Sequence, residues 1–265
     1  MPRALSPVTE FALLARVPDD SLDLERIAVS IARMGTPGLD PAAVSAALDH
    51  LAASVADLVD PCGPPDRLAG QMAHAFGRRL GFRGSQDAYR HADGSFLHRV
   101  IESRTGLPIL LGVVWILLGR RLGAPVAGVN YPGHFLTCIE APGARIYCDP
   151  FLGGEMADVR ELVARLPPGT DRRALEPAGV RPIAVRMLTN LKHLWVDQKD
   201  LALALGAVDR ILLLAGEVPQ EVRDRGLLAA HLGRGDEARR DLERYLQIAP
   251  DAGDRGEVER ILEET

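Results

Sequence analysis

A continuous apolar segment, Leu107–Leu118, is the feature that most constrains how this chain of 265 residues folds. Nearly every position in it is apolar, so the segment offers no polar face to water and belongs inside a domain. Pro108 suits the first turn of a helix, while Arg120 and Gly123 suit its end. Because the segment is too short to cross a bilayer, it predicts a buried central helix over residues 108–122.

Strand-like segments follow this helix. Residues 125–130 indicate one strand, and residues 134–140 and 145–149 indicate a hairpin around Ala141–Ala144. The first 80 residues instead repeat apolar positions at helical spacing, with breaks at proline and glycine. These patterns predict an α+β domain over residues 1–166, helix-rich with a small antiparallel sheet.

The hairpin has a register that brings two chemically active side chains together. If Glu140 opposes Arg145, alternation along each strand places His134 and Asp149 on the same face as diagonal neighbours. An aspartate beside a histidine orients the imidazole and supports proton transfer, but covalent acyl transfer also needs a nucleophile. His134 and Asp149 are therefore the candidate catalytic pair.

The three cysteines are poor candidates for that nucleophile. The same register points Cys148 away from the His–Asp face, and places Cys138 about 13 Å along the strand from His134 at the usual rise per residue. Cys62 lies in a proline- and glycine-rich break. Three cysteines without metal-ligand spacing favour a reducing, cytoplasmic location.

Metal, cofactor and nucleic-acid binding have no support in the sequence. His91 and His98 could form a metal site with Asp93, but no partner motif accompanies them, so surface or capping roles are expected. The net charge of −5 provides no general attraction for nucleic acid. We expect no cofactor, no metal, no signal peptide and no membrane association.

Several short motifs together resemble the SirB1 family of the transglutaminase-like superfamily, over residues 20–160. They are Gly81–Gly84, Ser95–Leu97, Gly106–Ile109, Arg120–Gly123, Gly128–Leu136 and Asp149–Phe151. In the wider superfamily, the resemblance implies a nucleophilic cysteine at the start of the central helix. This region reads Gly106-Leu107-Pro108 here, as in SirB1-like proteins generally. The chain departs from the family at Gly94, where asparagine is expected, and at Leu110, where serine is usual.

A second region, residues 183–265, follows a linker at 167–182 and resembles tetratricopeptide-type helical hairpins. Ala204 lies 34 residues before Ala238, which is one repeat length. We expect four leucines to pack between the helices, namely Leu228, Leu232, Leu242 and Leu246. Three arginines are expected nearer to solvent, namely Arg225, Arg239 and Arg244. The alternative is an ordinary helical bundle without a groove.

Three classes of function are compatible with these features. The first is a non-catalytic transglutaminase-like protein, a pseudoenzyme that binds a protein or peptide partner in interaction or regulation. The second is a cysteine-independent hydrolase or acyltransferase that uses His134 and Asp149. The third is a binder of a peptide or small molecule in the former catalytic cleft.

Overall fold

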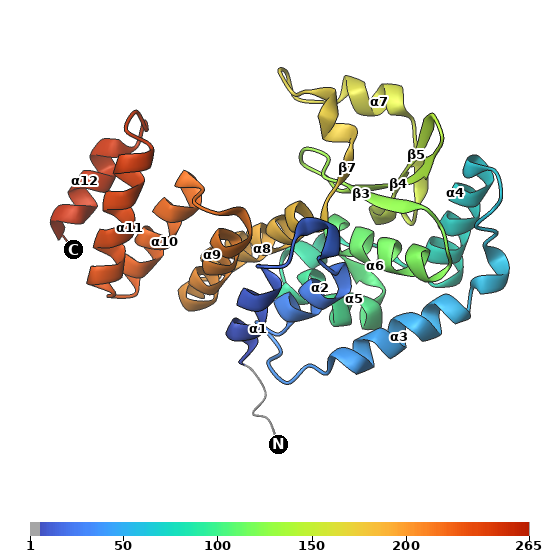
Figure 1. Ribbon diagram of the computed structural model, residues 1–265, viewed down its shortest axis with the longest axis horizontal. Helices are drawn as coiled ribbons and strands as arrows, with labels where there is room; N and C mark the ends of the chain where they lie inside the picture. The colour runs from blue at the N-terminus through green and yellow to red at the C-terminus, as the bar shows by residue number, and fades with distance from the viewer. Residues whose placement is uncertain (1–5, 265) are drawn as a thin grey trace. The chain divides into compact units, whose positions relative to one another are not determined.

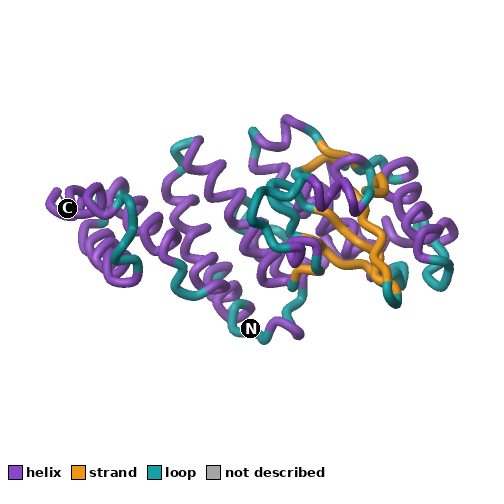
Figure 2. The backbone as a smooth tube through the Cα atoms, turned by 90° about the horizontal axis from the view of Figure 1, so that it is seen from above, coloured by secondary structure: helices purple, strands orange, loops and turns teal. Residues whose placement is uncertain are grey.

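The computed structural model describes residues 6–264, which form two compact units (Figure 1). One unit is Pro18–Met187; the other comprises the chain from Leu188 onward with the residues up to Val17. Among the described residues, strands occur only in the first unit, as Figure 2 shows. Unlike the expected range 1–166, the first unit includes residues 167–187, because β7 (Pro177–Ala178) pairs with β3 (Val126–Val129).

Helices make up most of the first unit, and side-chain caps begin several of them. Asp23 and Asp40 accept hydrogen bonds from the backbone N–H groups of Arg26 and Ala42. The α-helices are α2 (Leu24–Ala32), α3 (Pro41–Ala53), α4 (Pro65–Ala73), α5 (Leu97–Ser103), α6 (Pro108–Arg121), α7 (Val159–Ala164) and the first part of α8 (Val180–Asp197), up to Met187. Helix α4 continues into a six-residue π-helix, His74–Arg79.

The central helix is confirmed as α6, which ends one residue before its expected end. Every residue from Pro108 to Gly119 is buried. Trp115 lies at its middle, with its ring 5.1 Å from the ring of Phe76 in an edge-on arrangement. At its end, Arg121 binds carboxylates from both neighbouring helices, Glu25 at 2.8 Å and Asp49 at 2.6 Å.

An antiparallel sheet of five strands packs beside α6 (Figure 1), and this confirms the predicted fold class. Its order is β6-β5-β4-β3-β7, and its remaining strands are β4 (Leu136–Ala141), β5 (Ala144–Asp149) and β6 (Glu155–Ala157). The pairs Glu140–Arg145 and Cys138–Tyr147 confirm the predicted register. A separate parallel pair, β1 (Arg83–Gly84) with β2 (Thr105–Gly106), was not predicted.

The regular secondary structure in the described residues of the second unit is entirely helical. It contains α1 (Pro7–Leu14), the later part of α8 (Val180–Asp197), α9 (Leu201–Ala215), α10 (Pro219–His231), α11 (Gly235–Ile248) and α12 (Arg255–Glu264). Helices α10 and α11 form a hairpin in which Gly226 allows Leu242 to approach the backbone. Ala204 and Ala238 are both buried, as small residues at equivalent repeat positions should be.

The expected packing of this unit is largely correct. Leu228 and Leu242 are buried, while Leu232 and Leu246 are partly buried. Arg225 differs from the expectation of a solvent-directed arginine, because it is partly buried and forms two hydrogen bonds with Asp241. Within residues 6–264, none of the helices has both the length and the hydrophobicity that a membrane crossing requires.

Candidate functional site

A tight turn before β4 presents His134. The N–H of His134 donates to the carbonyl of Tyr131 at 3.0 Å, and Gly133 has a φ of +72°. Proline followed by a glycine with positive φ is the combination that a type II turn requires, so Pro132-Gly133 specifies this turn locally. The predicted strand start at His134 was wrong, because the turn delays the ladder until Leu136.

The next residue, Phe135, anchors the turn to the central helix. Its side chain is buried against Gly112 of α6, where an added Cβ would lie only 2.4 Å from the ring. Gly128 of β3 makes room for the same ring. Close packing of this kind tolerates almost no displacement, so the position of His134 depends on the contact between Phe135 and α6.

His134 and Asp149 meet as the register predicts. Nε2 of His134 lies 2.9 Å from Oδ2 of Asp149, and the side chains are 28% and 14% exposed. The other carboxylate oxygen accepts the N–H of Phe151 at 2.9 Å, which holds the carboxylate in place. Since the carboxylate accepts from Nε2, the neutral ring leaves Nδ1 unprotonated, with the lone pair of a general base.

Two aromatic side chains lie beside this pair, Phe151 next to His134 and Tyr89 next to Phe151. The Phe151 ring lies 6.0 Å from the His134 ring and 6.5 Å from that of Tyr89, both nearly edge-on. Partial burial raises the pKa of the Tyr89 hydroxyl. The positive charge of Arg186 acts against this increase, and the carboxylate of Asp149 adds to it. Tyr89 and Arg186 were not predicted, because their separation along the chain hides their proximity. Phe151, in contrast, stands within the Asp-Pro-Phe motif.

The cysteines do not supply a reactive thiolate here. Cys138 and Cys148 are buried in the sheet, and burial raises the pKa of each thiol to about 12. Both therefore stay protonated at neutral pH, and a protonated thiol is a poor nucleophile. Cys62 is exposed, in the turn before α4.

The start of α6 is apolar and closed. Leu107, Ile109 and Leu110 are buried there, and the N–H of Leu107 donates to the carbonyl of Gly94 at 3.0 Å. Ser95 is buried beside this contact, and its hydroxyl has no hydrogen-bond partner. Because leucine occupies position 110, no hydroxyl replaces the missing thiol there.

A cavity of about 560 Å³ opens beside the His–Asp pair. Its lining includes the acidic side chains of Glu155, Asp158 and Glu161, while Arg165 forms an ion pair with Glu161 at 3.0 Å. Carboxylates therefore outnumber cations around this cavity. Such a lining favours a neutral or cationic ligand over an anionic one.

The histidines near residue 95 do not form a metal site. His98 is buried, contrary to the predicted surface or capping role, and stacks against Phe96 with ring centres 6.1 Å apart. Asp93 pairs with Arg99 instead. Throughout residues 6–264, no group of three or more His, Cys, Asp or Glu side chains has an arrangement suited to a metal ion.

Replacing His134 with alanine should lower the free energy of unfolding by about 1–2 kcal/mol, because it leaves a largely buried carboxylate oxygen of Asp149 without its donor. Chemical denaturation followed by circular dichroism measures the change. His91→Ala is the matched control, since His91 is exposed in the same unit. Equal stability of the two variants would show that the His–Asp contact contributes nothing.

Comparisons with known proteins agree with this architecture. A family model described as "Transglutaminase-like superfamily" matches residues 42–189, and one described as "Tetratricopeptide repeat" matches residues 191–263. A "UPF0162 protein" of Xylella fastidiosa (strain 9a5c) is 37% identical over 250 residues, which cover 89% of this chain and 88% of the relative.

Two more distant relatives carry other names. "Protein SirB1" of Salmonella typhimurium is 29% identical over 178 residues, 64% of this chain and 66% of its own. "F-box only protein 21" of Pongo abelii is 29% identical over 199 residues, which make up 71% of this chain but 32% of that protein. No solved structure matches the chain.

Proposed function

Because this chain belongs to the transglutaminase-like superfamily, in a SirB1-like form with a tetratricopeptide-repeat region, we propose that it is a non-catalytic protein of interaction or regulation. The observation that carries the proposal is the closed, apolar start of α6, where Leu107-Pro108-Ile109-Leu110 provides neither thiol nor hydroxyl. His134 and Asp149 then act as a structural pair that joins the turn to the sheet.

The second unit supports the interaction role. Tetratricopeptide repeats generally mediate contacts between proteins, and helical hairpins stacked in series offer grooves that accept peptides. In this unit, α9, α10 and α11 stack as such hairpins, with α12 packed against α11. We propose that the partner is a protein or peptide, and that binding takes place in the cytoplasm.

Purified protein should show no covalent transamidation. An amine donor and a glutamine-containing peptide are incubated with the full chain, and product is followed by mass spectrometry. We expect no thioester intermediate, because the thiols of Cys138 and Cys148 are protonated and buried. An electrophilic thiol probe should label exposed Cys62 alone, without any linked turnover.

Three variants make this test decisive. Turnover that disappears in Cys62→Ala, in parallel with probe labelling, would overturn the non-catalytic proposal. Turnover that survives replacement of Cys62, Cys138 and Cys148 but disappears in His134→Ala would instead identify water-mediated hydrolysis.

The second candidate function is hydrolysis by water, without a cysteine nucleophile. The His134–Asp149 hydrogen bond beside an acid-lined cavity favours it, since Nδ1 of His134 has the lone pair needed to activate water. A binder of a peptide or small molecule would use the same cavity. Hydrolysis of unbiased peptide and ester substrates, compared between the native protein and His134→Ala, separates catalysis from binding.

The interaction role has its own test. The full chain is incubated with lysate, cross-linked and digested, and the linked peptides are identified. We expect the cross-links to partner proteins to map to residues 188–264. Cross-links confined to the surroundings of His134 would contradict the proposal that the repeat region makes the contact.

A further inference from the structure

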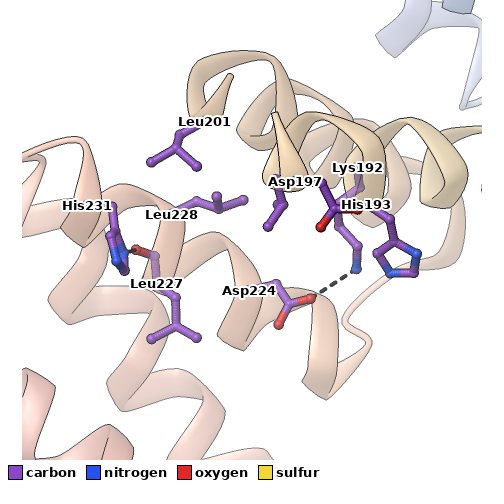
Figure 3. A pocket seen from close by; sticks show the side chains of 9 residues that line it. Lys192, His193, Asp197, Leu201, Asp224, Leu227, Leu228 and His231 are labelled. Atoms are coloured by element: carbon purple, nitrogen blue, oxygen red, sulfur yellow. Dashed lines mark hydrogen bonds and ion pairs between the residues drawn. The ribbon is translucent and has the colours of Figure 1, made fainter. Parts of the chain in front are cut away.

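A cavity of about 640 Å³ lies within the repeat region, between the later part of α8 and the helices α9 and α10 (Figure 3). Nine side chains line it: Lys192, His193, Val196, Asp197, Leu201, Asp224, Leu227, Leu228 and His231. All of them belong to the second compact unit. The cavity is therefore a feature of this unit alone.

The wall of this pocket is apolar where the helices meet. Leu201, Leu227 and Leu228 line it from α9 and α10, and Val196 adds an apolar side chain that is 43% exposed. Figure 3 shows these leucines gathered around the same hollow. A partner side chain that enters would remove this apolar surface, and its own, from water.

The positive charge of Lys192, the only lysine that lines the pocket, is already neutralised by two carboxylates. Nζ of Lys192 donates to Glu221 at 2.8 Å and to Asp224 at 2.9 Å, and the Lys192 side chain is only 6% exposed. An acidic ligand would have to displace these two partly buried carboxylates from Lys192, which makes the pocket unsuitable for a carboxylate.

The charge around the pocket is negative. Lys192 and Arg223 supply two positive charges. Arg223 belongs to this group because it forms ion pairs with Asp224, which lines the pocket, and with Asp254, at 2.6 Å. Four carboxylates oppose them, those of Asp197, Glu221, Asp224 and Asp254, so this group carries two excess negative charges. One oxygen of Glu221 is buried without a hydrogen-bond partner, and Asp197 stands exposed at the rim.

A histidine at the rim also accepts hydrogen bonds. Nδ1 of His231 lies 2.8 Å from the carbonyl oxygen of Leu227, so in the neutral ring Nδ1 carries the proton. Nε2 then carries the lone pair. The rim thus offers an imidazole nitrogen and the Asp197 carboxylate, both of which accept from a donor such as an ammonium or guanidinium.

We propose that this pocket binds a segment of a partner protein that inserts a large apolar side chain and carries lysine or arginine one or two residues away. The apolar group occupies the space beside Val196 and Leu227, and the cation pairs with Asp197 at the rim. This assignment rests on the proposed interaction role and adds the chemistry of the partner. Charge complementarity selects the basic residue, because the negative rim repels an acidic one.

A panel of matched peptides tests the assignment with the full chain. The peptides share polar, uncharged flanks and differ only in their central pair, which is Leu-Arg, Leu-Glu or Ser-Arg. Fluorescence anisotropy measures each affinity. We expect Leu-Arg to bind at least tenfold more tightly than either of the others, with an affinity that falls as salt is added.

Variants at the exposed rim test the ion pair with Asp197 and the apolar contact with Val196 separately. Asp197→Lys should weaken Leu-Arg about fivefold and reverse the preference towards Leu-Glu. Val196→Thr, which keeps the shape but adds a hydroxyl, should weaken both leucine peptides. The matched controls, Glu243→Lys and Val8→Thr, change exposed positions outside the pocket and should leave binding unaltered.

The outcomes are distinguishable. Equal affinity for Leu-Arg and Leu-Glu, or no binding at millimolar peptide, would overturn the assignment. A self-association of the full chain that Val196→Thr abolishes would also overturn it, because a second copy would then fill the pocket. If cross-links to a partner still map to residues 188–264 when the pocket variants have no effect, the interaction role stands and this inference alone fails.

Discussion

Replacing Trp115 with alanine should lower the free energy of unfolding of the transglutaminase-like unit by about 3–5 kcal/mol, the usual cost of removing a large buried aromatic side chain. The side chain lies at the middle of α6, in edge-on contact with Phe76. Gly154 packs directly against its ring, and an added Cβ at this position would meet the Trp115 side chain. Urea denaturation followed by circular dichroism measures the loss.

The matched control is Trp115→Phe. The indole Nε1 is buried and has no hydrogen-bond partner, so phenylalanine removes an unsatisfied donor while it keeps most of the ring contact. We expect a loss below about 1.5 kcal/mol. A phenylalanine variant as unstable as the alanine variant would show that the exact shape of the indole, and not the filling of the core, determines stability here.

Replacing Lys192 with methionine should cost about 3 kcal/mol of stability in the repeat unit. The substitution leaves the partly buried carboxylates of Glu221 and Asp224 without their shared cation, and removing one partner of such an ion pair is strongly destabilising. The loss should lie at the low end of the usual range, because Asp224 still receives hydrogen bonds from Arg223. Adding Glu221→Gln to Lys192→Met should restore part of the loss.

The chain provides a control of its own, since Lys199 is the only other lysine and is exposed. Lys199→Met should change stability by less than about 0.5 kcal/mol. If both lysine variants are equally stable, the ion pairs of Lys192 contribute nothing net.

The pH dependence has a definite sign. Burial by itself lowers the pKa of Lys192, but the hydrogen bonds of Glu221 and Asp224 outweigh it and leave the pKa raised. A raised lysine pKa stabilises the fold fully below the unfolded value of about 10.4 and loses that effect as pH rises through the folded value. The deficit of Lys192→Met should therefore be constant between pH 7 and pH 9.

Local patterns predicted the elements that position the candidate site. The apolar run predicted α6 to within one residue, and the turn at Ala141–Ala144 predicted the register that brings His134 to Asp149. These predictions succeed because strand alternation and helix termini depend on neighbours in the chain. The predicted strand start at His134 was wrong for a local reason as well, since Pro132-Gly133 specifies a turn that delays the strand until Leu136.

Contacts between distant segments could not be predicted in the same way. The burial of His98 depends on Phe96 and on Thr36, which lies 62 residues away. The parallel pairing of β1 with β2 joins segments more than 20 residues apart. Tyr89 and Phe151 lie side by side only in the folded chain, so neither residue signals the other in the sequence.

The sequence by itself determined the buried helix, the hairpin register, the facing His–Asp pair and the absence of a cysteine at the start of α6, because each depends on residue type and spacing over short distances. Only the tertiary structure decided that Lys192 is buried between Glu221 and Asp224, and that Val196 and Asp197 border an apolar pocket. The physical reason is that desolvation and ion pairing depend on which helices pack together. Spacing along one helix cannot specify the charges that a neighbouring helix presents.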